Sequence, residues 1–309
     1  MKFQFDHTHT SFIFTLTSEI PYKSKIPNLA DVIDSIILAG EKIQEIYETD
    51  FDVSTKDDSS PVTSADLESN KILRTALEKT GIPILSEESD DDKARLESEK
   101  VWIIDPVDGT QDFVNRTGEF TILVGLVENH IPIMGLVYVP IKKILYLAER
   151  GMGAFCYNDS ESHWGLKRRF GGWSLVRKKW KKIVVREIKE LEDCLALASR
   201  HHLSDVEKKM LSHLGIKNIG KIGSALKVME ISAGRADVYL SATRNKLSQW
   251  DTCGPNCIIS EAGGKMTDIS GNDLIYNTEI IKHENGLLVT NGFVHEKAVS
   301  KLSELKQVF

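Results

Sequence analysis

The chain has 309 residues, and its hydrophobic fraction of 41% is enough to bury the core of one large domain or of two ordinary ones. Its net charge of −6 argues against nucleic acid or an anionic membrane as the main partner. The four cysteines lack the spacing of a disulfide scaffold and are typical of reduced core thiols: Cys156, Cys194, Cys253 and Cys257.

The first part of the chain shows no sustained hydrophobic period, so residues 1–27 are predicted to be an extension with at most one strand. Its best apolar run, residues 12–14, is much shorter than a signal-peptide core or a membrane span. We therefore expect a cytoplasmic protein without membrane contact.

Two helices are expected next. Apolar residues recur at helical spacing over residues 28–47, and Asn28 is a plausible N-cap for this core-facing helix. A second helix should begin at Ser64 and stop near Gly81, because glycine readily adopts the conformation that ends helices. Its first turn carries Asp66.

Short apolar runs then indicate strands, with a hairpin turn at residues 128–130. The strands are expected near residues 83–85, 101–104, 121–127, 133–139 and 144–148. A second region begins with a strand at 194–198 and continues with helices near 205–214, 224–233 and 252–262. The pattern predicts an α/β (α+β) fold with layered helices and sheets in two lobes, residues 28–190 and 191–309.

A segment of different composition, about residues 158–182, interrupts the first lobe with basic residues interleaved among aromatic ones such as Trp164, Trp173 and Trp180. Such a mixture can grip single-stranded nucleic acid through phosphate contacts and base stacking. It also fits an exposed insertion whose charges attract an anionic substrate. We favour the second interpretation.

The strand at 101–104 leads into two aspartates. Asp105 follows it directly, Pro106 is expected to end its ladder, and Asp108 precedes Gly109, which permits a sharp turn. Because magnesium takes oxygen ligands, two such carboxylates and the Val107 carbonyl make a suitable site. Solvated aspartates at a turn are the alternative explanation.

Two further places add to this pattern. Glu87 and Glu88 follow another predicted strand, and Asp251 opens a predicted helix. Acidic side chains from three separate places therefore lie at the ends of elements, where one site can gather them. Gly109 and Thr110 are expected to begin a further helix. The free backbone N–H groups at the start of that helix are suited to holding a phosphate.

These motifs resemble those of the lithium-sensitive, magnesium-dependent phosphatase superfamily that contains inositol monophosphatases and CysQ-type 3′(2′),5′-bisphosphate nucleotidases. The similarity covers about residues 28–295 outside the basic insertion. Its specific pieces are Ser86-Glu87-Glu88-Ser89, Asp105-Pro106-Val107-Asp108-Gly109-Thr110, Trp250-Asp251-Thr252 and Glu261-Ala262-Gly263-Gly264. The nucleotidase branch is indicated by Gly118-Glu119-Phe120-Thr121, Ser199-Arg200-His201-His202 and Gly223-Ser224-Ala225-Leu226-Lys227, with His201 in place of the usual serine.

The resemblance implies a layered αβαβα sandwich and a role for each matching residue. Two or three magnesium ions would be bound by Glu87, Asp105, the Val107 carbonyl, Asp108 and Asp251. Asp66 and Thr110 would activate the attacking water. Substrate contacts would come from Gly109, Thr110, Ser199, His202, Gly223, Lys227 and Asp251. Simpler explanations exist for several of these: helix caps for Asp66 and Thr110, a solvated lysine for Lys227, a loop histidine for His202, and Glu88 in place of Glu87.

The implied activity is hydrolysis of 3′-phosphoadenosine 5′-phosphate to AMP and phosphate, with 3′-phosphoadenylyl sulfate as a related substrate and lithium as an inhibitor. The main partner would be this small adenosine bisphosphate. One alternative keeps the chemistry but acts on an inositol phosphate or fructose bisphosphate. Another is a non-catalytic nucleotide- or RNA-binding protein that uses the basic insertion. The sequence does not indicate an oligomeric state.

Overall fold

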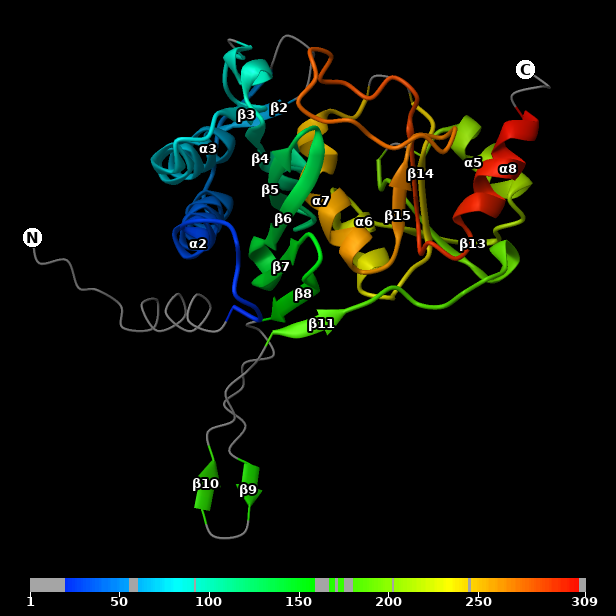
Figure 1. Cartoon of the computed structure of the whole chain (residues 1–309), viewed down its shortest axis with the longest axis horizontal. Coiled ribbons are helices and arrows are strands. Elements are labelled where there is room, and N and C mark those ends of the chain that lie inside the picture. The colour runs from blue at the N-terminus through cyan, green and yellow to red at the C-terminus, as the bar shows by residue number, and fades with distance from the viewer. Residues whose placement is uncertain are drawn as a thin grey trace, which may run out of the picture.

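The computed structural model describes residues 20–55, 61–91, 93–158, 167–169, 172–174, 180–201, 203–243 and 246–305. Helical layers alternate with a seven-stranded and a five-stranded sheet, which confirms the predicted αβαβα sandwich (Figure 1). Across the described ranges, no helix combines the length and the apolar character that a membrane crossing requires.

The seven-stranded sheet is antiparallel except where β3 and β4 run parallel. The hairpin predicted at residues 128–130 is confirmed, since β5 and β6 pair on either side of it. Two strands of this sheet, β8 and β11, were not predicted. In sheet order the strands are β11 (Lys181–Ile183), β8 (Gly153–Asn158), β7 (Ile144–Glu149), β6 (Ile131–Val139), β5 (Thr121–Glu128), β4 (Lys100–Asp108) and β3 (Ile84–Ser86).

Two helices, α2 (Leu29–Tyr47) and α3 (Ser64–Leu77), cover the outer face of this sheet (Figure 1). Both confirm the prediction, and Gly81 ends the 3-10 turn (Glu78–Thr80) after α3 with a φ of 70°. The predicted cap of α2 is wrong, because Asn28 has a φ of 58° and its side chain makes no capping hydrogen bond. A short ladder of β1 (Val53–Thr55) and β2 (Pro61–Thr63) precedes α3.

The five-stranded sheet has the order β13-β12-β14-β16-β15. Helices α5 and α8 cover its outer face, while α6 and α7 lie between the two sheets (Figure 1). Asp251 accepts a hydrogen bond from the Ser248 N–H, so α7 begins before the predicted residue 252. The elements are β12 (Leu195–Ala198), α5 (Asp205–His213), β13 (Asn218–Lys221), α6 (Leu226–Ser232), β14 (Val238–Ser241), α7 (Gln249–Glu261), β15 (Lys265–Thr267), β16 (Leu287–Thr290) and α8 (His295–Leu305).

Glycines bring α7 close to the first sheet. A Cβ at Gly135 of β6 would lie 2.1 Å from the Gly254 carbonyl oxygen of α7, and one at Gly125 of β5 would lie 2.3 Å from the sulfur of Cys253. Neither distance leaves room for a side chain. The helix is therefore held directly on the sheet, and its first turn is fixed relative to the end of β4.

Replacing Gly135 with alanine is expected to destabilise the fold by about 1–3 kcal/mol, because the added methyl must push α7 off the sheet. Thermal unfolding measures this effect. Gly220→Ala on β13 is the matched control, since its Cβ would lie 3.1 Å from the end of the Leu197 side chain and 4.0 Å from the Ala196 carbonyl oxygen, with no backbone atom closer. Equal losses from both variants would contradict the close packing of α7.

The basic insertion lies mostly outside the described residues. Within it, β9 (Lys167–Arg169) and β10 (Gly172–Ser174) pair antiparallel, and their side chains are not described. Trp180 is described, and it is buried against Tyr157 with ring centroids 5.7 Å apart. The prediction that the exposed insertion extends to residue 182 is therefore wrong at its end, because Trp180 belongs to the core and β11 to the sheet. Residues 1–19 of the predicted extension are not described.

Candidate active site

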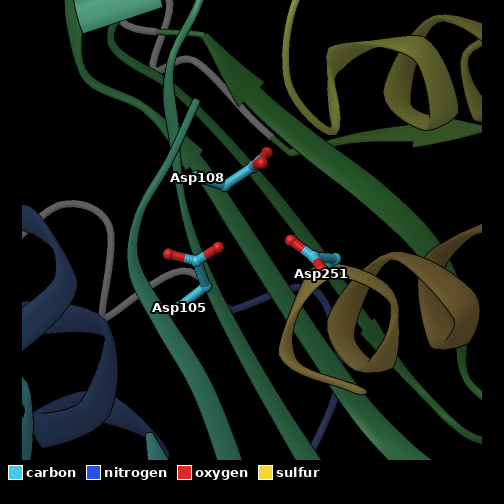
Figure 2. A group of neighbouring side chains, drawn as sticks. All are labelled: Asp105, Asp108 and Asp251. Carbon is cyan, nitrogen blue, oxygen red and sulfur yellow. The ribbon is translucent and has the colours of Figure 1, made fainter. Parts of the chain in front are cut away.

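Three carboxylates from two distant parts of the chain meet between the first sheet and α7. Asp105 and Asp108 lie at the end of β4, and Asp251 lies in the first turn of α7. One oxygen from each lies within 4.8 Å of the other two, and Figure 2 shows the side chains around a common space. The structure thus brings together aspartates that the sequence places far apart.

An irregularity at the end of β4 determines how Asp105 and Asp108 are placed in the cluster. Asp105 and Asp108 both pair with β5, with a register shift between them. Because Pro106 has no N–H, the ladder is interrupted there. The prediction that Pro106 ends the ladder is wrong, since pairing resumes at Asp108. The Val107 N–H donates to Asp105 Oδ1 at 3.0 Å, and Gly109 turns the chain with a φ of 93°.

Glu87 lies beside this end of β4. The parallel pairing of β3 with β4 puts it there, and the Glu87 N–H donates to the Ile104 carbonyl at 3.3 Å. Burial raises the pKa of Asp105 well above its ordinary value, and the neighbouring charge of Glu87 is the next cause. The Glu87 carboxylate is therefore close enough to act on the cluster.

Helix α3 holds both acidic turns in place. The Asn70 side chain accepts from the Ser86 hydroxyl at 2.8 Å and donates to the Glu88 carbonyl at 3.1 Å. One residue earlier, the Ser69 hydroxyl donates to the Pro106 carbonyl at 2.8 Å. The turn after β3 and the turn within β4 are thus fixed to the same helix.

Burial raises the pKa values of all three clustered aspartates. Burial, followed by the charges of Asp108 and Glu87, raises the pKa of Asp251 well above its ordinary value. Burial also raises the pKa of Asp108, although Lys227 and the N–H of Ala225, 2.5 Å away, act in the opposite direction. Gathered carboxylate oxygens are the ligand set of a hard divalent cation, whose charge would offset this repulsion. The residues present therefore fit magnesium.

Asp66 and Thr110 lie next to this cluster. Thr110 Oγ1 is 3.1 Å from Asp66 Oδ1 and 3.1 Å from the Val107 carbonyl oxygen. Asp66 Oδ2 accepts from the N–H and the hydroxyl of Thr63, which caps α3. Asp66 therefore caps α3 through Oδ2 and contacts Thr110 through Oδ1, so the two roles do not exclude one another.

A cavity of about 160 Å³ with both polar and apolar lining opens beside the carboxylates, between α4 (Thr110–Val114), α6 and the loop after β12. Of the substrate residues predicted from the sequence, it is lined by Gly109, Ser199, Lys227 and Asp251. Gly223 borders its wall, because a Cβ there would lie 2.3 Å from Asp112 Oδ2. His202 lies outside the described residues.

Lys227 is buried, with 6% of its surface exposed, so the explanation as a solvated lysine is wrong. Burial lowers its pKa to about 8, while Asp108 and Asp112 act in the opposite direction. Its Nζ donates to the Ser224 carbonyl at 2.5 Å. A second cation, Lys246, lines the same cavity. Two lysines thus face a space that adjoins the acidic cluster.

Two polar pairs beside this cavity were not predicted from the sequence. His201 Nε2 lies 3.0 Å from Asp112 Oδ1, so the histidine that replaces serine in the motif meets a buried carboxylate. Glu119 pairs with Arg200 and accepts from the Gly223 N–H at 2.7 Å. The position of Glu119 in a recognised motif was a signal for this role. Asp112 carried no such signal.

Residues 29–307 match the model of the inositol monophosphatase family. The chain belongs to this family. Magnesium dependence is general in the family, and the carboxylate cluster offers matching ligands. The family match covers all elements that form the cluster and the cavity.

Several relatives in the family carry a more specific name. The 3′(2′),5′-bisphosphate nucleotidase CysQ of Shigella flexneri is 30% identical over 243 residues, which cover 77% of this chain and 89% of that protein. The CysQ of Aggregatibacter actinomycetemcomitans is 33% identical over 254 residues, covering 81% and 87%. The crystal structure of CysQ from Bacteroides thetaiotaomicron is 32% identical and superimposes with a TM-score of 0.69, covering 85% and 96%.

Proposed function

We propose that this chain is a magnesium-dependent 3′(2′),5′-bisphosphate nucleotidase that hydrolyses 3′-phosphoadenosine 5′-phosphate to AMP and phosphate. The observation that carries the proposal is a cluster of three carboxylates beside the Asp66–Thr110 contact, opening into a cavity with two lysines. The CysQ relatives support the nucleotide as substrate. The related 3′-phosphoadenylyl sulfate is a second expected substrate.

Magnesium would be held by Glu87, Asp105, the Val107 carbonyl, Asp108 and Asp251. When bound, it supplies positive charge that offsets the phosphoryl oxygens and makes water more acidic. Glu87 is preferred to Glu88 because its charge acts on Asp105 and Asp251. We propose that the site holds two or three magnesium ions.

Thr110 and Asp66 would prepare the attacking water. With its hydrogen directed to Asp66 Oδ1, the Thr110 hydroxyl presents a lone pair that can accept a hydrogen bond from water. A proton leaving the water can then pass through Thr110 Oγ1 to Asp66 Oδ1. The water oxygen would bond to phosphorus as the bond to the ribose 3′-oxygen breaks. That oxygen would take a proton from solvent water to give AMP, and Asp66 would return its proton to solvent as inorganic phosphate leaves.

The rest of the nucleotide would occupy the cavity. Ser199, His202 and Gly223 are proposed to contact it, while Gly109 and Thr110 hold the phosphate that is cleaved. Lys227 and Lys246 offer positive charge to the other phosphate. A bisphosphate therefore suits this cavity better than a monophosphate, because both of its charged ends find a partner.

A phosphate-release panel tests the proposal. The panel contains 3′-phosphoadenosine 5′-phosphate, 3′-phosphoadenylyl sulfate, inositol 1-phosphate, inositol 1,4-bisphosphate and fructose 1,6-bisphosphate, each with and without magnesium. We expect the highest kcat/KM for the adenosine bisphosphate and AMP as its product. Release of its 5′-phosphate, or preference for an inositol or fructose phosphate, would overturn the assignment.

A cytoplasmic location remains a prediction that cell fractionation can check.

Affinity for the nucleotide should fall above about pH 8. Lys227 is protonated below its lowered pKa of about 8 and loses its charge as the pH rises through that value. The KM for the adenosine bisphosphate should therefore rise between pH 8 and pH 9. A Lys227→Gln variant should have a high KM at all pH values with no such rise. A wild-type KM that stays constant up to pH 9 would contradict this role.

Lithium should inhibit phosphate release at millimolar concentration by occupying a cation position next to Asp105 and Asp108. Potassium at the same ionic strength is the control. Steady-state rates with each salt measure the effect. Equal rates in the two salts would show that the cation positions do not accept lithium.

A further inference from the structure

Residues 276–283, named here the strap, run across the first turn of α7. The Gln249 N–H donates to the Ile281 carbonyl at 2.8 Å, and the Gln249 side chain accepts from the Asn277 N–H at 2.7 Å. Gln249 Nε2 also donates to the Thr278 hydroxyl at 2.7 Å. Further along, Thr252 Oγ1 lies 2.7 Å from His283 Nε2. The strap therefore holds α7 on both sides of Asp251.

Arg95 joins the strap to the loop that follows β3. It is buried, with 2% of its surface exposed. Its Nε and Nη2 donate to the two oxygens of Asp91 at 3.0 and 2.7 Å. Its Nη1 donates to Asn277 Oδ1 at 2.8 Å, and the Thr278 carbonyl accepts from both terminal nitrogens at 3.2 Å. The planar guanidinium thus fixes two separate segments with one set of hydrogen bonds.

These two segments carry two of the proposed metal ligands. Asp91 lies in the same loop as Glu87, and the strap holds the turn that contains Asp251. The charge of Glu87 raises the pKa of Asp251, so like charges oppose the approach of these two carboxylates and contacts elsewhere must favour it. Arg95 lies in the same loop as Glu87, and its buried side chain links that loop to the strap. Two further contacts join the same segments: Lys93 pairs with Glu279 at the surface, and the Asn277 side chain donates to the Arg95 carbonyl.

We propose that Arg95 is a positioning residue that sets the separation of Glu87 and Asp251 and thereby the affinity for magnesium. This inference rests on the proposed metal site, but not on the identity of the substrate. Groups that orient metal ligands without touching the metal typically contribute tenfold to a hundredfold to metal affinity. For Arg95, which acts through two segments, we expect the lower end of that range.

A second partly buried ion pair, Arg186 with Asp237, provides a matched control. Arg186 Nε donates to Asp237 Oδ1 at 2.7 Å, and Nη2 contacts the second oxygen, in the same two-pronged geometry as Arg95 with Asp91. Asp237 is fully buried and holds the N–H of Leu195 in the five-stranded sheet. An Arg186→Met variant therefore loses a comparable pair outside the cation cluster.

The test is a calorimetric magnesium titration of the full chain without substrate, together with thermal unfolding. Arg95→Met should raise the Kd for magnesium about tenfold, and Arg95→Lys should recover part of the loss. Arg186→Met should lower the Tm and leave the Kd unchanged. With saturating magnesium, the kcat of Arg95→Met should return close to the wild-type value and the substrate KM should not change.

Equal magnesium affinities for Arg95→Met and the wild type would show that Arg95 only stabilises the fold. A loss of affinity in Arg186→Met as large as in Arg95→Met would overturn the inference in the same way. If Arg95→Met does not fold, Asp91→Asn is the second variant. It removes the negative charge that pairs with Arg95, and Asp91 is the more exposed of the two residues. A magnesium Kd of Asp91→Asn equal to that of the wild type would also reject it. Failure of the nucleotidase activity would appear separately, as normal magnesium binding without phosphate release.

Discussion

Asp105→Asn should lower magnesium-dependent phosphate release about 10³-fold or more, because several kcal/mol of charge stabilisation correspond to at least three tenfold steps in rate. The same change should stabilise the protein when magnesium is absent. Burial of the Asp105 charge, followed by repulsion from Glu87, Asp108 and Asp251, raises the free energy of the folded state, and asparagine removes both contributions. Asparagine keeps an oxygen that can accept from the Val107 N–H.

The measurement is a pair of unfolding curves, with and without magnesium, beside steady-state kinetics. If about 1 kcal/mol of repulsion is relieved, the Tm without magnesium should rise by about 2–4 °C. The wild type should gain stability on adding magnesium, and the variant should gain much less. An Asp105→Asn protein with full activity, or with the wild-type response to magnesium, would exclude the proposed ligand set.

Thr110→Ala should lower kcat by about 10²–10⁴-fold, the range typical of a lost proton-transfer group, while the KM for the nucleotide changes little. The physical reason is the contact between Thr110 Oγ1 and Asp66 Oδ1, which is the only route that the proposal gives for the water's proton. Thr110→Ser keeps the hydroxyl and should stay close to wild-type activity. Rates at saturating nucleotide and magnesium measure the change.

Asp66 requires a control because it also caps α3. Thr63→Ala removes the cap hydroxyl and should cost about 1 kcal/mol of stability with kcat unchanged. Asp66→Asn should lose kcat to an extent similar to Thr110→Ala. If Thr63→Ala and Asp66→Asn reduce kcat equally, the role of Asp66 is confined to the helix cap.

The secondary structure around the site was predictable because its signals are local. The helical period of residues 28–47 and the strand-like runs before Glu87 and Asp105 depend only on neighbours in sequence. The strands β8 and β11 were not predicted, since the basic insertion separates them and they pair across it. The cap at Asn28 failed for a related reason: its backbone adopts a φ of 58° in the folded chain, which the residue type alone does not determine.

The amino-acid sequence by itself determined which residues are acidic, which ones end a strand or open a helix, and which motifs resemble a phosphatase family. Only the tertiary structure decided that Asp251 faces Asp105 and Asp108, because glycines on β5 and β6 let α7 lie directly on the first sheet. The tertiary structure likewise decided that Lys227 is buried and that Arg95 connects two loops far apart in the chain. Local periods fix elements, whereas the separation of side chains on different elements is fixed by packing, which no short stretch of sequence contains.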